Sequence, residues 1–188
     1  MSRARASQVM VVAEDRRIQR FVVHALTIIG HKPHEIRLDA LPLGSGSGEK
    51  WVRERYPMQL TTFRRRAARA QTALVLGMDA DVLTTESRLK QLEQKLRDQN
   101  IDERANSESV ALLVTRRNIE TWILCLTGTT VNERDDYKGC ADFDALILRA
   151  ASTFVEWARR RPDSMPESCL PSILAATMEI RRIPPMNT

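Results

Sequence analysis

The run Ala73–Met78 (ALVLGM) most constrains how this 188-residue chain can fold. A continuous apolar run of this length is typical of a strand that is buried on both faces of a parallel sheet. Similar runs occur at Gln8–Ala13 and Ser109–Thr115, and each of the three is followed by apolar residues at helical spacing. Strands that alternate with helices in this way predict an α/β fold.

The rest of the chain predicts one weaker strand and further helices. The strand is expected at His34–Leu43, followed by a flexible loop at Gly44–Gly48, which is rich in glycine and serine. We therefore expect a parallel sheet of about four strands flanked by helices in residues 1–128, and an α-helical C-terminal extension, residues 129–188, packed on the same domain. The expected helices are residues 18–29, Gln59–Ala70, Thr85–Gln99, Ile119–Leu126, Asp142–Arg160 and Pro171–Arg182.

The composition excludes several classes of protein. A content of 43% hydrophobic residues is enough for a folded core, and no stretch approaches the roughly 18 apolar residues of a membrane span. The basic segment 2–7 runs directly into a strand and does not resemble a signal peptide, so we expect a cytoplasmic protein with no membrane partner. The three cysteines form no close pair and the three histidines lie elsewhere, which argues against a disulfide framework or a zinc site.

Arginine dominates the positive charge. The net charge is +5, and of the 29 basic residues five are lysine and the rest are arginine. Arginine binds carboxylates and phosphates through two parallel hydrogen bonds, so the bias fits a phosphate-bearing partner or a network of surface ion pairs. Arg64 and Arg65 belong to an arginine cluster that is either a nucleic-acid face or a solvated helix face. Lys50 ends a Gly-rich segment that departs from the phosphate-loop pattern and is either a substrate loop or a linker.

Acidic residues follow the predicted strands. Glu14 and Asp15 come directly after the first strand, Asp79 and Asp81 follow the central one, and Glu120 lies five residues beyond the fourth. The carboxyl ends of parallel strands meet at one edge of a sheet, and carboxylates gathered there repel one another unless they share a cation. An all-oxygen ligand set favours Mg²⁺, with one ion or two. Alternatively, Asp15 caps a helix, Asp81 is a turn residue and Glu120 is solvated or ion-paired.

Two of these motifs resemble a known family. A glutamate at the end of the first strand (VVAED, Glu14), followed by Asp-Xaa-Asp after a later apolar strand (LVLGMDAD, Asp79 and Asp81), resembles the Toprim domain of primases, topoisomerases and OLD-type nucleases. The stretch NIETW, residues 118–122, is similar to small stand-alone Toprim-like proteins of bacterial antiphage defence loci. The resemblance implies that Glu14 acts as an acid, a base or a metal ligand, and that Asp79 and Asp81 hold Mg²⁺. The chain departs from the family at Asp15, where many Toprim domains have glycine.

The resemblance leaves a choice between activities. A topoisomerase needs a strand-breaking tyrosine on a large scaffold, and a primase needs further modules, whereas metal-assisted phosphodiester hydrolysis makes the fewest demands. We therefore expect an Mg²⁺-dependent nuclease of DNA or RNA, acting as an effector subunit in antiphage defence, with Arg16 and Arg17 near enough to hold phosphate. The alternatives are a non-catalytic regulatory or nucleic-acid-binding subunit that works through a partner ATPase, and a hydrolase of small phosphoesters.

Overall fold

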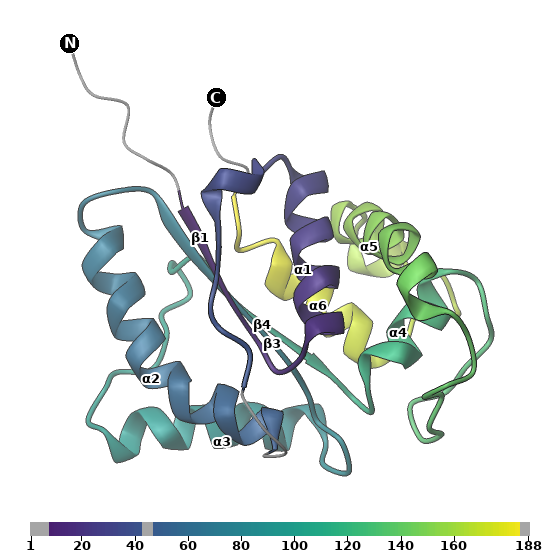
Figure 1. Ribbon diagram of the computed structural model, residues 1–188, viewed down its shortest axis with the longest axis horizontal. Helices are drawn as coiled ribbons and strands as arrows, with labels where there is room; N and C mark the ends of the chain where they lie inside the picture. Colours follow the sequence, from purple (N-terminus) through teal and green to yellow (C-terminus); the bar gives the residue numbers. More distant parts are fainter. Residues whose placement is uncertain (1–7, 43–46, 185–188) are drawn as a thin grey trace.

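The computed structural model describes residues 8–42 and 47–184, and within them the chain forms an α/β fold (Figure 1). Four parallel strands build one sheet in the order β2-β1-β3-β4. These strands are β1 (Gln8–Ala13), β2 (Ile36–Leu38), β3 (Thr72–Asp79) and β4 (Val110–Thr115). The helices are α1 (Arg16–Ile29), α2 (Gly48–Ala67), α3 (Thr85–Asp98), α4 (Ile119–Leu126), α5 (Phe143–Arg159) and α6 (Pro171–Ile180).

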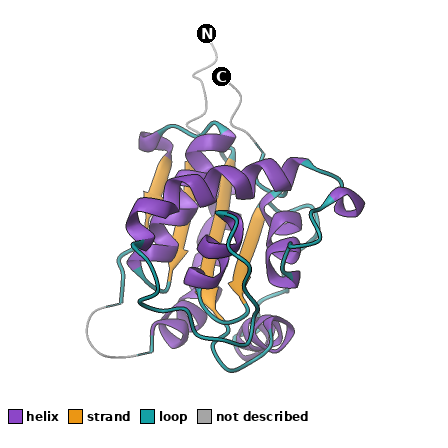
Figure 2. Ribbon diagram, turned by 90° about the vertical axis from the view of Figure 1, so that its right-hand side faces the viewer, coloured by secondary structure: helices purple, strands orange, loops and turns teal. Residues whose placement is uncertain are grey.

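Helices cover both faces of the sheet. Helices α2 and α3 pack on one face, and α1, α4, α5 and α6 lie on the other (Figure 1). A turn of 90° places helices in front of the strands (Figure 2). Every residue of β3 and β4 is buried, as expected for strands between two helical layers. Both strands are therefore fixed by packing on both faces, which holds their carboxyl ends in place.

The strand order creates a topological switch point between β1 and β3. The chain leaves β1 toward β2 on one side, then crosses back over β1 to form β3 on the other side. The connections that follow β1 and β2 therefore lie on opposite faces of the sheet, with α1 on one and α2 on the other. A crevice at the carboxyl ends of such a strand pair is where open parallel sheets bind ligands. Glu14 directly follows β1 and Asp79 ends β3.

Short polar side chains define where several helices begin. Asp15 Oδ1 accepts a hydrogen bond from the Ile18 amide at 2.8 Å, and Thr84 Oγ1 accepts one from the Ser87 amide at 3.0 Å. Asn118 Oδ1 accepts a hydrogen bond from the Thr121 amide at 3.1 Å. Each satisfies an amide that has no partner inside its helix. Asp15 therefore caps α1, which confirms the capping alternative given for it from the sequence.

Two expected elements differ from the structure. The strand expected at His34–Leu43 is limited to Ile36–Leu38, because residues 33–35 form a 3₁₀ turn and the Asp39 side chain accepts hydrogen bonds from α2. The helix expected from Gln59 begins at Gly48 and continues through Pro57. Burial of Val52 and Tyr56 against the sheet stabilises this earlier segment despite the amide that proline lacks.

The expected loop at Gly44–Gly48 overlaps this helix. Residues 43–46 lie outside the described residues, whereas Ser47 caps α2 and Gly48 is its first residue. The first turn of α2 therefore starts where a loop was expected. This places Glu49 and Lys50 on a helix beside the carboxyl end of β1.

The C-terminal helices share the core with the sheet. Phe154 of α5 packs against Phe21 of α1 and Trp122 of α4, with ring centroids 5.3 Å and 6.0 Å apart. Trp122 also donates from Nε1 to Ser172 Oγ of α6 at 2.7 Å. The boundary at residue 128 remains a prediction, but the two sides of it form one hydrophobic cluster. No helix of the described residues is both long and apolar enough to cross a membrane.

Candidate acidic site at the carboxyl ends of β1 and β3

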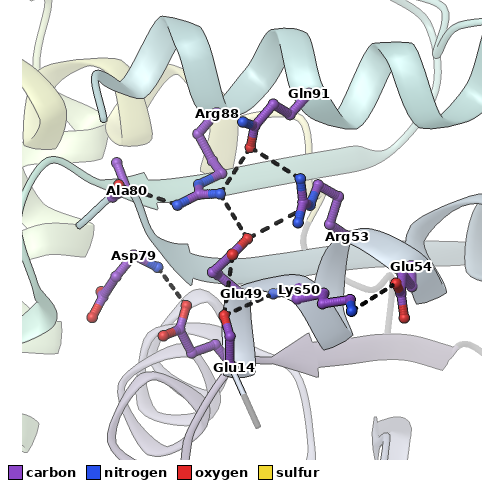
Figure 3. Close-up of polar contacts among 10 residues, drawn as sticks. Glu14, Glu49, Lys50, Arg53, Glu54, Asp79, Ala80, Arg88 and Gln91 are labelled. Carbon is purple, nitrogen blue, oxygen red and sulfur yellow. Dashed lines mark hydrogen bonds and ion pairs between the residues drawn. The ribbon is translucent and has the colours of Figure 1, made fainter. Parts of the chain in front are cut away.

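Glu14 and Asp79 lie together at the switch point. Glu14 Oε2 accepts a hydrogen bond from the Asp79 amide at 2.9 Å (Figure 3), and the Glu14 amide donates to Gly77 O at 3.0 Å. Asp79 is buried, with 3% of its surface exposed, and its Oδ1 accepts a hydrogen bond from Thr115 Oγ1 at 2.7 Å. Two of the predicted site residues are therefore brought together by neighbouring strands.

The two carboxylates have no basic partner in the described part of the chain, where no lysine, arginine or histidine forms an ion pair with either. Burial raises the pKa of Glu14 from 4.5 to about 7. The hydrogen bond from the Asp79 amide opposes this rise, and the charges of Asp81, Asp15 and Glu49 add to it. Burial, followed by the charge of Glu14, raises the pKa of Asp79 well above its ordinary value, although the Thr115 hydroxyl opposes the change. Negative charge at this point is thus unfavourable without a cation.

Asp81 lies in the turn that follows β3. Its φ of 55° is in the left-handed region, which aspartate adopts more readily than most residues other than glycine and asparagine. The turn is closed by a hydrogen bond of 3.0 Å from the Leu83 amide to Ala80 O. Asp81 is therefore a turn residue, as one alternative held, and its charge still acts on Glu14.

Glu120 is held by an arginine that the sequence analysis assigned to phosphate binding. Arg17 Nη1 forms an ion pair with Glu120 Oε1, and the Glu120 side chain is buried. The Arg17 guanidinium also lies 5.3 Å from the centre of the Phe143 ring. The ion-paired alternative therefore describes Glu120, although its charge still contributes to the raised pKa of Asp79.

The other basic residues expected to bind nucleic acid lie at different points of the surface. Arg16 is exposed at the start of α1, and Lys50 is exposed on α2 with its Nζ 4.0 Å from Glu54. Arg64 binds Glu108 with its Nε 2.7 Å from Oε1 and also donates to two backbone carbonyls, so it stabilises the fold as one alternative proposed. Arg65 is exposed on the same helix, and its Nη2 lies 3.4 Å from Thr62 Oγ1.

Sequence reasoning missed the residues that α2 and α3 bring to the site. A Cβ added at Gly48 would lie 2.8 Å from Glu14 O, so the first turn of α2 packs directly on Glu14. Glu49, the next residue, binds Arg88 of α3 (Figure 3), and Arg88 donates from Nη2 to Ala80 O at 3.2 Å. A serine followed by a charged helical segment is the local signal for the start of α2. No local signal places Arg88 beside it.

Comparisons place no further constraint on the site. No family model, curated protein or solved structure matches this chain. The Toprim resemblance therefore remains a prediction that rests on the short motifs given above.

The two carboxylates suit an Mg²⁺ site in which water and substrate supply most of the ligands. Across residues 8–42 and 47–184, no group of three or more His, Cys, Asp or Glu side chains is gathered closely enough to hold a metal ion. Mg²⁺ usually takes one or two protein carboxylates and completes its octahedron with waters and substrate phosphates. Glu14 and Asp79 form such a pair, and neither is neutralised by a basic side chain of the described chain. The residues therefore fit one ion, and the second ion remains a prediction.

Proposed function

We propose that this protein is an Mg²⁺-dependent nuclease whose site is Glu14 and Asp79, with Asp81 beside them. The observation that carries the proposal is the meeting of two acidic residues at the switch point of a parallel sheet, where the Asp79 amide donates to Glu14 Oε2 and neither side chain has a basic partner among the described residues. Ligands bind at this point in open α/β sheets. The resemblance to Toprim nucleases of antiphage defence extends the proposal to an effector role against invading nucleic acid.

The roles of the residues follow from their surroundings. Asp79 is fixed by the Thr115 hydroxyl and the buried end of β3, so it offers a preorganised oxygen ligand. Glu14 is half-buried and meets Asp79, so it is placed to bind the same ion, or to take a proton from a nearby water and return it to the leaving oxygen. A bound Mg²⁺ would supply charge stabilisation at the phosphate and a more acidic water. Arg16 and Lys50, both exposed, would hold phosphates away from the reacting bond.

The test is cleavage of labelled DNA and RNA by the purified protein with Mg²⁺ or with EDTA. We expect Mg²⁺-dependent cleavage that falls by about 100-fold or more in Asp79→Asn, a difference of about 2.7 kcal/mol in activation free energy. Asp163→Asn is the matched control, because Asp163 is exposed on a remote 3₁₀ turn and loses the same charge. Equal cleavage by the wild type and Asp79→Asn would exclude this site.

One observation favours a second function, that of a regulatory or nucleic-acid-binding subunit of a partner ATPase. Only two of the proposed ligands are joined by a hydrogen bond, and the described residues contain no preformed group of three metal-binding side chains. A site of this kind can bind without turning over substrate. If a copurifying ATPase complex keeps full activity in the double variant Asp79→Asn and Asp81→Asn, the regulatory function replaces the catalytic one.

A further inference from the structure

Two arginines beside the acidic site share one carboxylate. Arg88 Nη1 donates to Glu49 Oε2 at 2.6 Å, and Arg53 Nε lies 3.6 Å from the same oxygen (Figure 3). Gln91 Oε1 lies 2.8 Å from Arg88 Nη1 and 3.5 Å from Arg53 Nη1. One carboxylate and one amide oxygen therefore hold two guanidinium groups close together.

This arrangement leaves positive charge and hydrogen-bond donors unsatisfied. Two arginines face a single carboxylate among the described residues, so the group carries a net positive charge. The Nε atoms of both Arg53 and Arg88 are buried and have no hydrogen-bond acceptor in the described chain, and the Arg88 residue is only 4% exposed. A buried donor without an acceptor destabilises the folded state. The oxygens of a tetrahedral phosphate group point in directions that those of a planar carboxylate do not, so such a group can reach donors that Glu49 leaves unsatisfied.

The arginine pair borders the candidate site. Arg88 Nη2 donates to Ala80 O at 3.2 Å, and Ala80 lies between Asp79 and Asp81. Glu49 follows Gly48, whose added Cβ would lie 2.9 Å from Glu14 Cγ, and the charge of Glu49 acts on Glu14. An anion in the place of the Glu49 carboxylate would therefore lie beside the proposed reacting group.

We propose that Arg53 and Arg88 form a binding site for the phosphodiester oxyanion of a nucleic acid, and that the Glu49 carboxylate occupies this site in the free protein. The inference rests on the proposed function and names the residues that recognise its substrate. Guanidinium groups match phosphate geometry through parallel hydrogen bonds. One phosphodiester carries one negative charge on two non-bridging oxygens, as a carboxylate does, so its exchange with Glu49 leaves the charge at the arginines unchanged.

The exchange requires the Glu49 side chain to move away from the arginines. Its side chain is 16% exposed, at the first turn of α2, where Glu49 Oε1 accepts a hydrogen bond from Ser47 Oγ at 3.1 Å. Rotation toward solvent would free the arginines and also take one negative charge away from Glu14. Glu49 thus competes with substrate for the arginines and weakens its binding.

Binding without a metal ion tests the inference. A short labelled DNA oligonucleotide is titrated in EDTA at low salt against the wild type, Glu49→Gln and Glu167→Gln. We expect Glu49→Gln to bind about 10-fold more tightly than the wild type, and Glu167→Gln to change affinity less than about 2-fold. Glu167 is exposed between the 3₁₀ turn at residues 162–164 and α6 and loses the same charge, so it controls for net charge. Equal affinities for the two variants would overturn the inference.

Two further measurements keep the inference testable. If Glu49→Gln does not fold, Arg53→Gln is compared with Arg160→Gln, an exposed arginine of equal charge at the end of α5. We expect Arg53→Gln to weaken binding about 10-fold relative to Arg160→Gln, and equal binding would again overturn the site. A gain in Glu49→Gln that is seen with inorganic phosphate but not with the oligonucleotide would exclude the phosphodiester as ligand. Because these measurements use EDTA, they stay decisive even if Asp79→Asn shows that the protein is not a nuclease.

Discussion

Glu179 and Asp79 are acidic residues at two margins of the same sheet with opposite surroundings. We call the surroundings of Glu179, at the β4 edge, the paired margin, and those of Asp79 and Glu14, at the carboxyl ends of β1 and β3, the unpaired margin. Glu179 of α6 closes the β4 edge: it accepts hydrogen bonds from Arg104 Nη2 at 2.9 Å and from the Leu112 amide at 3.0 Å, and pairs with Arg182. Asp79, at the end of β3, accepts a hydrogen bond from a hydroxyl and lies beside another carboxylate. The edge acid has its cationic partners within the fold, whereas the acid at the switch point has no cationic partner among the described residues.

The largest expected effect comes from breaking the paired margin. Glu179→Gln removes the charge that holds Arg104 and Arg182, so we expect the free energy of unfolding to fall by about 2–3 kcal/mol. Urea denaturation at neutral pH measures this change. The control is Glu156→Gln, which loses an exposed pair within α5 and should cost about 0.5 kcal/mol or less. Similar losses in the two variants would contradict the role of Glu179 at the edge.

At the unpaired margin, we expect Glu14 to make the stability of the protein depend on pH. The pKa of Glu14 is raised in the folded protein from 4.5 to about 7, so the folded state binds more protons than the unfolded state between these values. Stability is therefore greatest below about pH 4.5 for this group, and is lost as the pH rises to about 7, by an amount on the order of 2 kcal/mol. Denaturation in EDTA between pH 5 and 8 measures this loss. A free energy of unfolding that does not change over this range would contradict it.

Magnesium should reverse that loss. An ion that binds the folded protein and not the unfolded one stabilises it by mass action, about 2.7 kcal/mol when the free ion is 100 times its dissociation constant. We therefore expect the stability at pH 8 to rise with Mg²⁺ concentration in the wild type. An equal rise in Asp79→Asn would show that the ions bind elsewhere.

A smaller effect is expected when charge is removed from the unpaired margin. Asp79→Asn keeps an oxygen for the Thr115 hydroxyl and removes the repulsion with Glu14. We expect the variant to be more stable than the wild type by about 1 kcal/mol at pH 8 in EDTA, because it no longer buries a charge without a cationic partner. Thermal or urea unfolding beside Asp163→Asn measures the difference, and destabilisation by Asp79→Asn would mean that its carboxylate is favourable in the fold.

The smallest effect separates Asp15 from its acidic neighbours. Asp15 Oδ1 caps α1 through the Ile18 amide, so Asp15→Ala should lower the free energy of unfolding by about 1 kcal/mol. Asp15→Asn keeps the capping oxygen and removes the charge, so it should leave stability within a few tenths of a kcal/mol. If both variants abolish Mg²⁺ binding, Asp15 is a ligand as well as a cap.

Local patterns in the sequence were enough to locate most elements. The apolar run Ala73–Met78 lies within β3, which extends one residue further at each end, and Leu92 and Leu96 of the expected helix after it are buried. The helix before Pro57 was missed, because local propensity disfavours a helix through proline whereas the packing of Val52 and Tyr56 on the sheet stabilises it.

By itself, the sequence determined that this chain forms a parallel α/β sheet and that acidic residues follow its strands, because both depend on hydrophobic patterns between close neighbours in the chain. The tertiary structure decided which acids meet. Strand order brought Glu14 to Asp79, and packing of α3 on α2 brought Arg88 to Glu49, 39 residues away. Pairings of this kind are set by the three-dimensional path of the chain, since an ion pair depends on distance in space and leaves no period in the sequence.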